Sequence, residues 1–188
     1  NGIRQQQYLS TNPDVDNFSK IPSLSELAGS TQVIQTVDAS LRSPYVMQSM
    51  VSLERQLPAG TTVAVTYTTT RGVHTLRSLD FNAPLPGSGV FPLGTGNPWF
   101  AMTSSGLSRQ NQLMTNVTSK LNRRISLTGY YSWNRARSDS DGLGTFPANP
   151  YDYVGEYGPS SNDIRHTVNA SGSIDTFWNI RLNPLISL

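Results

Sequence analysis

The sequence has no cysteine, few charged residues and no long apolar run. Without cysteine, the chain can form neither disulfides nor thiolate metal sites. Its apolar stretches are too short for a membrane-spanning helix, which needs about 20 apolar residues in succession. Charged residues make up only 14% of the chain and hydrophobic residues only 36%, both less than is usual in a soluble domain. A disulfide-stapled domain and a helical membrane protein are therefore excluded.

Clustered positive charge is scarce as well. The net charge is +2 at pH 7, and no run of Lys and Arg is longer than the pair Arg123 and Arg124. We therefore expect no nucleic-acid partner. Ser, Thr, Asn, Gln, Gly and Pro take up the missing fraction, and this mixture favours strands and turns over helices. The chain starts at Asn1 without a visible signal peptide, so we expect it to be an internal part of a longer protein.

The chain alternates between apolar and polar residues over most of its length. Residues 1–30 are the exception, and Pro13, Pro22 and Gly29 within them predict a loop or irregular segment. From Val33 onward the apolar residues recur at every second position, except at residues 77–107, which have no regular period, and at residues 138–161; this indicates strands with one apolar face. Pro44 either divides two strands or marks where one long strand leaves the sheet. The alternation predicts strands near residues 33–56, 61–76, 108–121, 125–138, 162–174 and 178–188.

The connections between these strands are alternately short and long. Tight turns are predicted at Leu57–Gly60, Asn122–Arg124 and Asp175–Phe177. Two loops rich in Gly and Pro, residues 77–107 and 138–161, join the hairpins. Loops of this length are uncommon in compact soluble domains. They are usual on the outer side of membrane barrels, whose periplasmic turns are short.

These features predict an all-β fold, an antiparallel meander of about six long strands that forms a segment of a large transmembrane β-barrel. Residues 31–188 form the partial barrel in this interpretation, in contact with the lipid of the bacterial outer membrane. The three turns then face the periplasm and the two long loops face outward. Because the smallest barrels have about 8 strands, we expect further strands outside this chain.

The two faces of the predicted strands have different partners. Val65 and Leu127 lie on the apolar face, which is expected to contact lipid, and Thr66 and Thr128 lie on the opposite face. Aromatic residues also fall on the apolar face, as in the girdles that mark membrane interfaces. The alternative is that they form the core of a soluble β-sandwich. The aromatic residues in question are Tyr67, Tyr131, Trp133 and Trp178.

Several segments together point to a known family. They are Ser43–Gln48 leading to Leu53–Leu57, Val65–Tyr67 with Thr70–His74, Asp80–Gly87, Leu121–Arg124 with Tyr130–Ala136, and Asp163–His166. In this order they resemble the β-barrel of TonB-dependent outer-membrane receptors, in particular the Oar-like group. They cover residues 40–188. The resemblance implies a barrel of about 22 strands, a separate plug domain and contact with the TonB complex.

The predicted function is therefore the barrel section of a TonB-dependent receptor that imports a bulky substrate. One alternative is a passive porin-like channel, which has the same strand pattern. Another is a soluble secreted β-rich module, such as an adhesin or a carbohydrate-binding domain. A plug domain upstream would distinguish the receptor from the porin.

No catalytic set is recognisable, so we predict neither an enzyme nor a cofactor. Asp139 and Asp141 precede Gly142 with the spacing of half a calcium loop, but no closing Glu follows, which favours an acidic loop tip. His74 and His166 are the only histidines, and a structural role is expected for both. Aromatic residues in the loops suit either ligand contact or packing between loops. They are Trp99, Phe100, Tyr151, Tyr153 and Tyr157.

Overall fold

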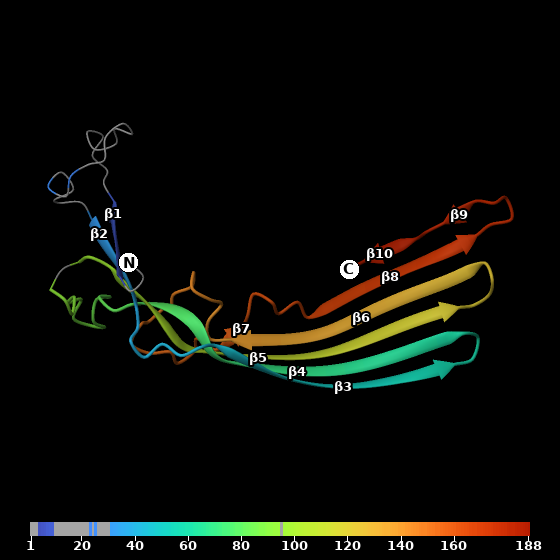
Figure 1. Cartoon of the computed structure of the whole chain (residues 1–188), viewed down its shortest axis with the longest axis horizontal. Coiled ribbons are helices and arrows are strands. Elements are labelled where there is room, and N and C mark those ends of the chain that lie inside the picture. The colour runs from blue at the N-terminus through green and yellow to red at the C-terminus, as the bar shows by residue number, and fades with distance from the viewer. Residues whose placement is uncertain (1–3, 10–22, 24, 26–30, 95) are drawn as a thin grey trace. The chain divides into compact units, whose positions relative to one another are not determined.

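The computed structural model describes residues 4–9, 23, 25, 31–94 and 96–188 (Figure 1). The described residues divide into two compact units. The first, called the strand unit here, comprises residues 45–73, 107–139 and 157–188. The second, called the loop unit, comprises residues 1–44, 74–106 and 140–156. Every regular element in the described part of the chain is a β-strand, which confirms the all-β prediction.

The strand unit is an antiparallel sheet whose long strands are neighbours in chain order (Figure 1). Its strands are β3 (Tyr45–Leu57), most of β4 (Thr61–Asp80), most of β5 (Trp99–Lys120), β6 (Ile125–Ser138) and β8 (His166–Asp175). β3 has 13 residues and β6 has 14, more than the about 9–11 that a tilted strand needs to cross a membrane. Three short strands complete the unit, namely β7 (Gly158–Pro159) beside β6, and β9 (Arg181–Leu182) and β10 (Leu185–Ser187) beside β8.

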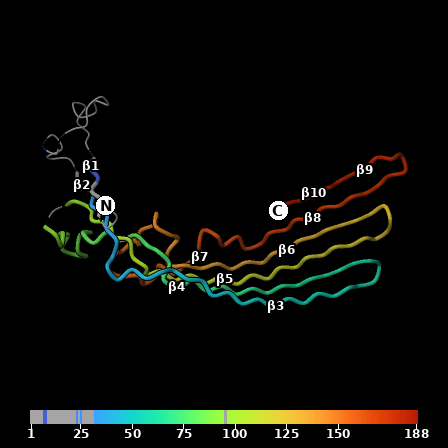
Figure 2. Tube along the Cα trace, in the orientation of Figure 1, coloured from blue at the N-terminus to red at the C-terminus, as the bar shows by residue number. Residues whose placement is uncertain are grey.

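Tight turns close the hairpins at one end of the strand unit (Figure 2). Ala59 and Gly60 both adopt a positive φ, 58° and 60°, directly before β4 begins. The Gly60 carbonyl then accepts the Lys120 N–H at 3.1 Å, which fastens this turn to the neighbouring hairpin. In the next turn the Asn122 side chain accepts the N–H groups of Arg124 and Ile125 at 2.8 and 2.9 Å. These contacts fix the register of each hairpin at its turn.

The loop unit contains a small sheet and two long connections. β1 (Arg4–Leu9) pairs antiparallel with β2 (Thr31–Val37), and β2 pairs parallel with the start of β5, from Ile34 opposite Trp99 to Val37 opposite Met102. The parallel pairing joins segments more than 60 residues apart in sequence. Among the described residues, no helix is long and apolar enough to cross a membrane, a finding that has no bearing on spans made of strands.

The loop between β4 and β5 is built around one buried amide. The Asn82 side chain donates to the Asn97 carbonyl at 2.8 Å and accepts the Leu93 N–H at 2.9 Å. Asp80 contributes a second anchor, since its Oδ1 accepts the N–H groups of Asn82 and Trp99 at 2.9 and 3.0 Å. Backbone groups that the loop buries are thereby satisfied without a strand ladder.

The loop after β6 packs against the same part of the loop unit. Ser140 and Ser78 donate to the carbonyls of Leu76 and Leu143 at 2.9 and 2.5 Å. The Phe100 and Phe146 rings are 4.9 Å apart between centroids. Side chains therefore hold the loop after β6 against β4 and β5.

The structure corrects several predicted boundaries. Arg4–Leu9 is a strand, β1, within the segment predicted to be irregular at residues 1–30, most of which lies outside the described residues. The predicted strand 33–56 is two strands, β2 and β3, with Pro44 between them because proline cannot donate to a ladder. The predicted loop 77–107 is shorter, since β4 runs on to Asp80 and β5 starts at Trp99.

The other corrections concern the last hairpin. The predicted strand 162–174 begins only at His166, because the chain turns at Asp163, whose N–H donates to the Ser160 carbonyl at 3.0 Å. The predicted strand 178–188 is broken into β9 and β10. Trp178 lies in the turn before β9, where the Thr176 N–H donates to the Ile180 carbonyl at 2.9 Å and Asn179 has a φ of 58°. Trp178 is therefore a turn residue and not part of a strand face.

Candidate functional site

One face of the strand unit carries apolar side chains that are open to the surroundings. In the β3–β4 hairpin, Val51 lies opposite Tyr67 and Leu53 opposite Val65. Val51 and Leu53 are 74% and 72% exposed, and Leu127 on β6 is 42% exposed. We call this the apolar face. Its rows continue across β5, β6 and β8, where Leu113 pairs with Trp133 and Tyr131 with Val168.

The opposite face, called the polar face here, carries hydroxyl and amide groups bonded to one another across strands. Ser52 and Thr66 share a hydrogen bond of 2.8 Å between β3 and β4. Between β5 and β6, the Gln112 amide donates to Ser132 at 3.0 Å and the Gln110 amide donates to Asn134 at 2.9 Å. Each of these bonds links uncharged side chains on two neighbouring strands.

Burial in this protein is inverted relative to a soluble protein. Among the described residues only three apolar residues are buried, whereas nine polar or charged residues are. The buried apolar residues are Leu79, Ala101 and Ala136; the polar ones are Thr66, Thr68, Arg77, Asn82, Thr103, Ser119, Ser132, Asn134 and Ser138. In water such a sheet would expose its most apolar side chains at a large free-energy cost. An apolar solvent on one side and water on the other satisfy both faces.

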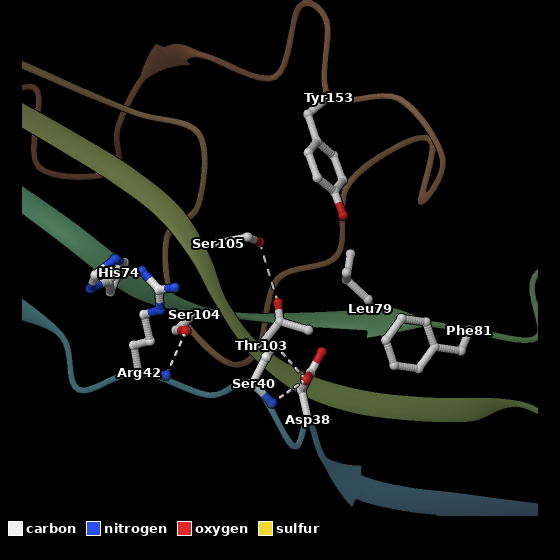
Figure 3. Close-up of a pocket in the computed structure, with 10 residues that line it drawn as sticks. All are labelled: Asp38, Ser40, Arg42, His74, Leu79, Phe81, Thr103, Ser104, Ser105 and Tyr153. Atoms are coloured by element: carbon white, nitrogen blue, oxygen red, sulfur yellow. Dashed lines mark hydrogen bonds between the residues drawn. The ribbon is translucent and has the colours of Figure 1, made fainter.

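The loop unit contains a pocket of about 380 Å³ that is lined by both polar and apolar groups (Figure 3). Asp38 is at one side, and its Oδ1 accepts the Ser40 hydroxyl and the Ser40 N–H, both at 2.7 Å. These two hydrogen bonds hold the pKa of Asp38 below its ordinary value, because they stabilise the ionised form. The pocket lining consists of Asp38, Ser40, Arg42, His74, Leu79, Phe81, Thr103, Ser104, Ser105 and Tyr153.

The pocket has rigid supports. The Arg42 N–H donates to the Ser104 hydroxyl at 2.9 Å, which ties the segment before β3 to β5. The guanidinium of buried Arg77 lies 4.5 Å from the centre of the Tyr153 ring, a cation–π contact that positions this tyrosine. His74 has a φ of 59°, a backbone conformation that residues other than glycine rarely adopt. Hydroxyls, one carboxylate, one guanidinium and aromatic rings together suit a polar organic ligand.

A family model for the outer membrane beta barrel domain matches residues 3–179, nearly the whole chain. The chain belongs to this family. The inverted burial of the strand unit has its explanation in that membership: the barrel domain is located in the outer membrane, and its apolar face contacts membrane lipid. No curated protein and no solved structure matches the chain.

The predicted acidic candidates have other contacts in the barrel domain. Asp139 Oδ1 accepts the Leu107 N–H at 2.6 Å and so ends the β5–β6 ladder. Asp141 lies in the loop that follows. Within the described ranges, no group of three or more His, Cys, Asp or Glu side chains is arranged to hold a metal ion.

The histidines and the loop aromatics contact other parts of the barrel domain. His166 Nδ1 and the Tyr131 hydroxyl are 3.0 Å apart on the apolar face, and His74 lines the pocket. Trp99 Nε1 donates to Thr36 at 3.0 Å, and the Tyr151 hydroxyl donates to the Ala83 carbonyl at 2.6 Å. Phe100 packs against Phe146, and Tyr153 packs against Arg77. The Arg137 guanidinium lies 5.3 Å from the Tyr157 ring centre.

Two features were missed by the sequence analysis. Asn82 organises a loop that was predicted to have no regular period, and its side chain gives no signal in an alternation pattern. A group of arginines on the apolar face was missed as well, although its signal was present. Arg135 and Arg137 continue the alternation of β6 beyond Trp133.

Proposed function

We propose that this barrel domain is the wall section of a TonB-dependent, Oar-like outer-membrane receptor that imports a bulky substrate. The two-faced sheet supports a wall with lipid on one side and a water-filled passage on the other. The ordered resemblance over residues 40–188 supports the assignment to energised receptors rather than to passive channels. The proposed role is transport and not catalysis.

The proposed orientation follows from the length of the connections. The turns at Leu57–Gly60 and Asn122–Arg124 lie at one end of the strand unit (Figure 2). Short turns face the periplasm in outer-membrane barrels, and long loops face outward. The long connections, which belong to the loop unit together with its pocket, would then face outward. We propose that the groups lining this pocket contribute to substrate recognition.

The proposal also includes further strands and a plug. Lipid requires that every backbone polar group be paired, so a membrane sheet must close on itself. β3 has β4 as its only partner in the described sheet, which leaves its other edge available for a strand outside residues 1–188. A plug domain within the closed wall would distinguish an energised receptor from an open channel.

Single-channel conductance of the full-length protein tests this function. The protein is inserted into a planar lipid bilayer in potassium chloride solution. A plugged receptor is expected to show no steady conductance until a denaturant such as urea loosens the plug, after which channel openings appear. A large steady conductance immediately on insertion would refute the receptor and establish the porin-like alternative.

A further inference from the structure

Arginine side chains form a row across three strands on the apolar face. Arg109 on β5 lies directly opposite Arg137 on β6, and Asn111 lies opposite Arg135 in the neighbouring row. Thr61 bonds to Ser119 at 2.7 Å and Thr69 to Asn111 at 3.0 Å, eight residues farther along both strands. This constant register places Arg71 of β4 opposite Arg109. The row is therefore Arg71, Arg109 and Arg137, with Arg135 beside it.

On β6 the row follows directly after the apolar residues of the same face, whereas on β3 Met47 lies opposite Arg71. Arg135 is the first residue after Trp133 on the same face and Arg137 is the second, so they lie about 7 and 13 Å farther along β6. Tyr67, whose hydroxyl donates to Asn111 at 3.2 Å, and Tyr131 lie on the apolar side of the row. Aromatic residues mark the boundary between hydrocarbon and headgroups. The arginines are thus at the level of lipid headgroups, on the surface that faces lipid.

Like charges directly opposite each other weaken a sheet, so this row carries an unfavourable electrostatic energy. No ion pair neutralises Arg71, Arg109, Arg135 or Arg137 within the described residues. Asp163 interacts electrostatically with Arg135, but its carboxylate is already engaged. It accepts the Ala136 N–H at 2.8 Å and pairs with Arg165 at 3.0 Å. An anion bound among the arginines would remove the repulsion.

The space between three of these arginines, Arg109, Arg135 and Arg137, is large enough for a phosphate group. A groove of about 240 Å³ is lined by Arg109, Asn111, Arg135, Arg137 and Tyr157. Tyr157 holds the Arg137 guanidinium against its ring, which orders that side chain. Planar guanidinium groups bind phosphate through paired hydrogen bonds, and they do so better than ammonium groups.

We propose that Arg71, Arg109, Arg135 and Arg137 form a binding site for the phosphate groups of a phosphorylated glycolipid in the outer leaflet. The apolar band below the row contacts the acyl chains of the same lipid. The inference rests on the proposed function only through the outward orientation of this end of the sheet; it requires neither a plug nor TonB.

Lipid binding by the full-length protein in non-ionic detergent tests the site. The probe is bis-phosphorylated lipid A, and bound lipid is counted by native mass spectrometry over a concentration series. Replacing both Arg109 and Arg137 by Gln is expected to weaken binding roughly 10- to 30-fold. Arg55→Gln is the matched control, because Arg55 lies on the same face of β3 near the turn end, and it should leave binding unchanged.

Three results would overturn the site: equal binding of dephosphorylated lipid A, displacement of lipid A by millimolar inorganic phosphate, or equal binding of phosphatidylglycerol. Heat-modifiable migration in gel electrophoresis confirms that each variant is folded. Replacing Arg109 and Arg137 by Lys keeps the charge and is expected to restore part of the binding. Binding by the folded Lys variant that is no stronger than binding by the Gln variant would contradict the attraction between the row and the phosphate charge. The conductance of the full-length protein is a separate readout, so failure of the receptor proposal is distinguishable from failure of the lipid site.

Discussion

The strand unit and the loop unit bury polar groups for different reasons. In the strand unit, buried polar residues such as Thr66 and Ser132 belong to a whole face of polar side chains, and each bonds to a neighbour on the next strand. In the loop unit, single side chains such as Asn82 are buried to satisfy the backbone of an irregular segment. A membrane wall thus depends on a repeated pattern, whereas its loops depend on a few particular residues.

The largest effect is expected where charge is placed on the apolar face. Leu127→Arg should destabilise the folded protein in lipid, by an amount that rises to about 2–4 kcal/mol at mid-membrane depth. Thr128→Arg, at the next residue on the opposite and also exposed face, should cost far less. Urea unfolding of the full-length protein in lipid vesicles measures both variants. Equal costs at the two positions would show that the two faces do not differ in their solvent.

A smaller and local effect is expected in the loop unit. Asn82→Ala removes a buried amide and leaves the Asn97 carbonyl and the Leu93 N–H without their partner, at a cost of about 1–3 kcal/mol. Limited proteolysis of intact cells should then cleave the loop at residues 81–98 faster, while the migration of the folded barrel stays unchanged. Ser88→Ala, at an exposed position in the same loop, is the control and should be cleaved at the original rate.

The first turn offers neighbouring substitutions with effects of opposite sign. Gly60→Ala should destabilise the hairpin by about 1 kcal/mol, because φ is positive and a Cβ there would lie 3.0 Å from the Lys120 carbonyl oxygen. Ala59→Gly should stabilise it by up to about 1 kcal/mol, since Ala59 already has a positive φ. The midpoint of urea unfolding checks both. Loss of stability in both variants would contradict the strain assigned to Ala59.

The smallest effect concerns pH at Asp163. Its pKa is held below its ordinary value, first by the hydrogen bond from the Ala136 N–H and then by that from Arg165. The stabilisation by this carboxylate is therefore fully present above about pH 4 and is lost as the pH falls through the lowered pKa. In the Asp163→Asn variant, the amide hydrogen of Ala136 should exchange with solvent faster at neutral pH than in the original protein. In acid the two exchange rates should become more alike. A difference that persists unchanged at the lowest pH would exclude this role.

Much of the strand unit could be predicted because apolar and polar residues alternate regularly along its strands. Alternation alone assigns Val65 and Leu127 to the apolar face and Thr66 and Thr128 to the opposite face. The turn at Leu57–Gly60 follows from residues that set or permit unusual backbone angles. The sequence allowed two interpretations of Pro44, and one of them was the observed break between β2 and β3.

The remaining features depend on contacts that the local sequence does not specify. β2 pairs with β5 across more than 60 residues, and no nearby residue indicates such a partner. Asp80 extends β4 beyond its predicted end because its carboxylate accepts the Trp99 N–H. Trp178 matched the strand alternation, but the hydrogen bonds of Thr176 place it in a turn. The arginine row emerged only once the register aligned three strands.

The register of the sheet also sets an order of folding. β3 and β4 are separated by only three residues, so each of their contacts closes a short stretch of chain at little entropic cost. The pairing of β2 with β5 must instead close a long stretch of chain before it gains any hydrogen bond. Chains form local contacts fastest. The hairpins are therefore expected to form first, and the pairing of β2 with β5 is expected to form last.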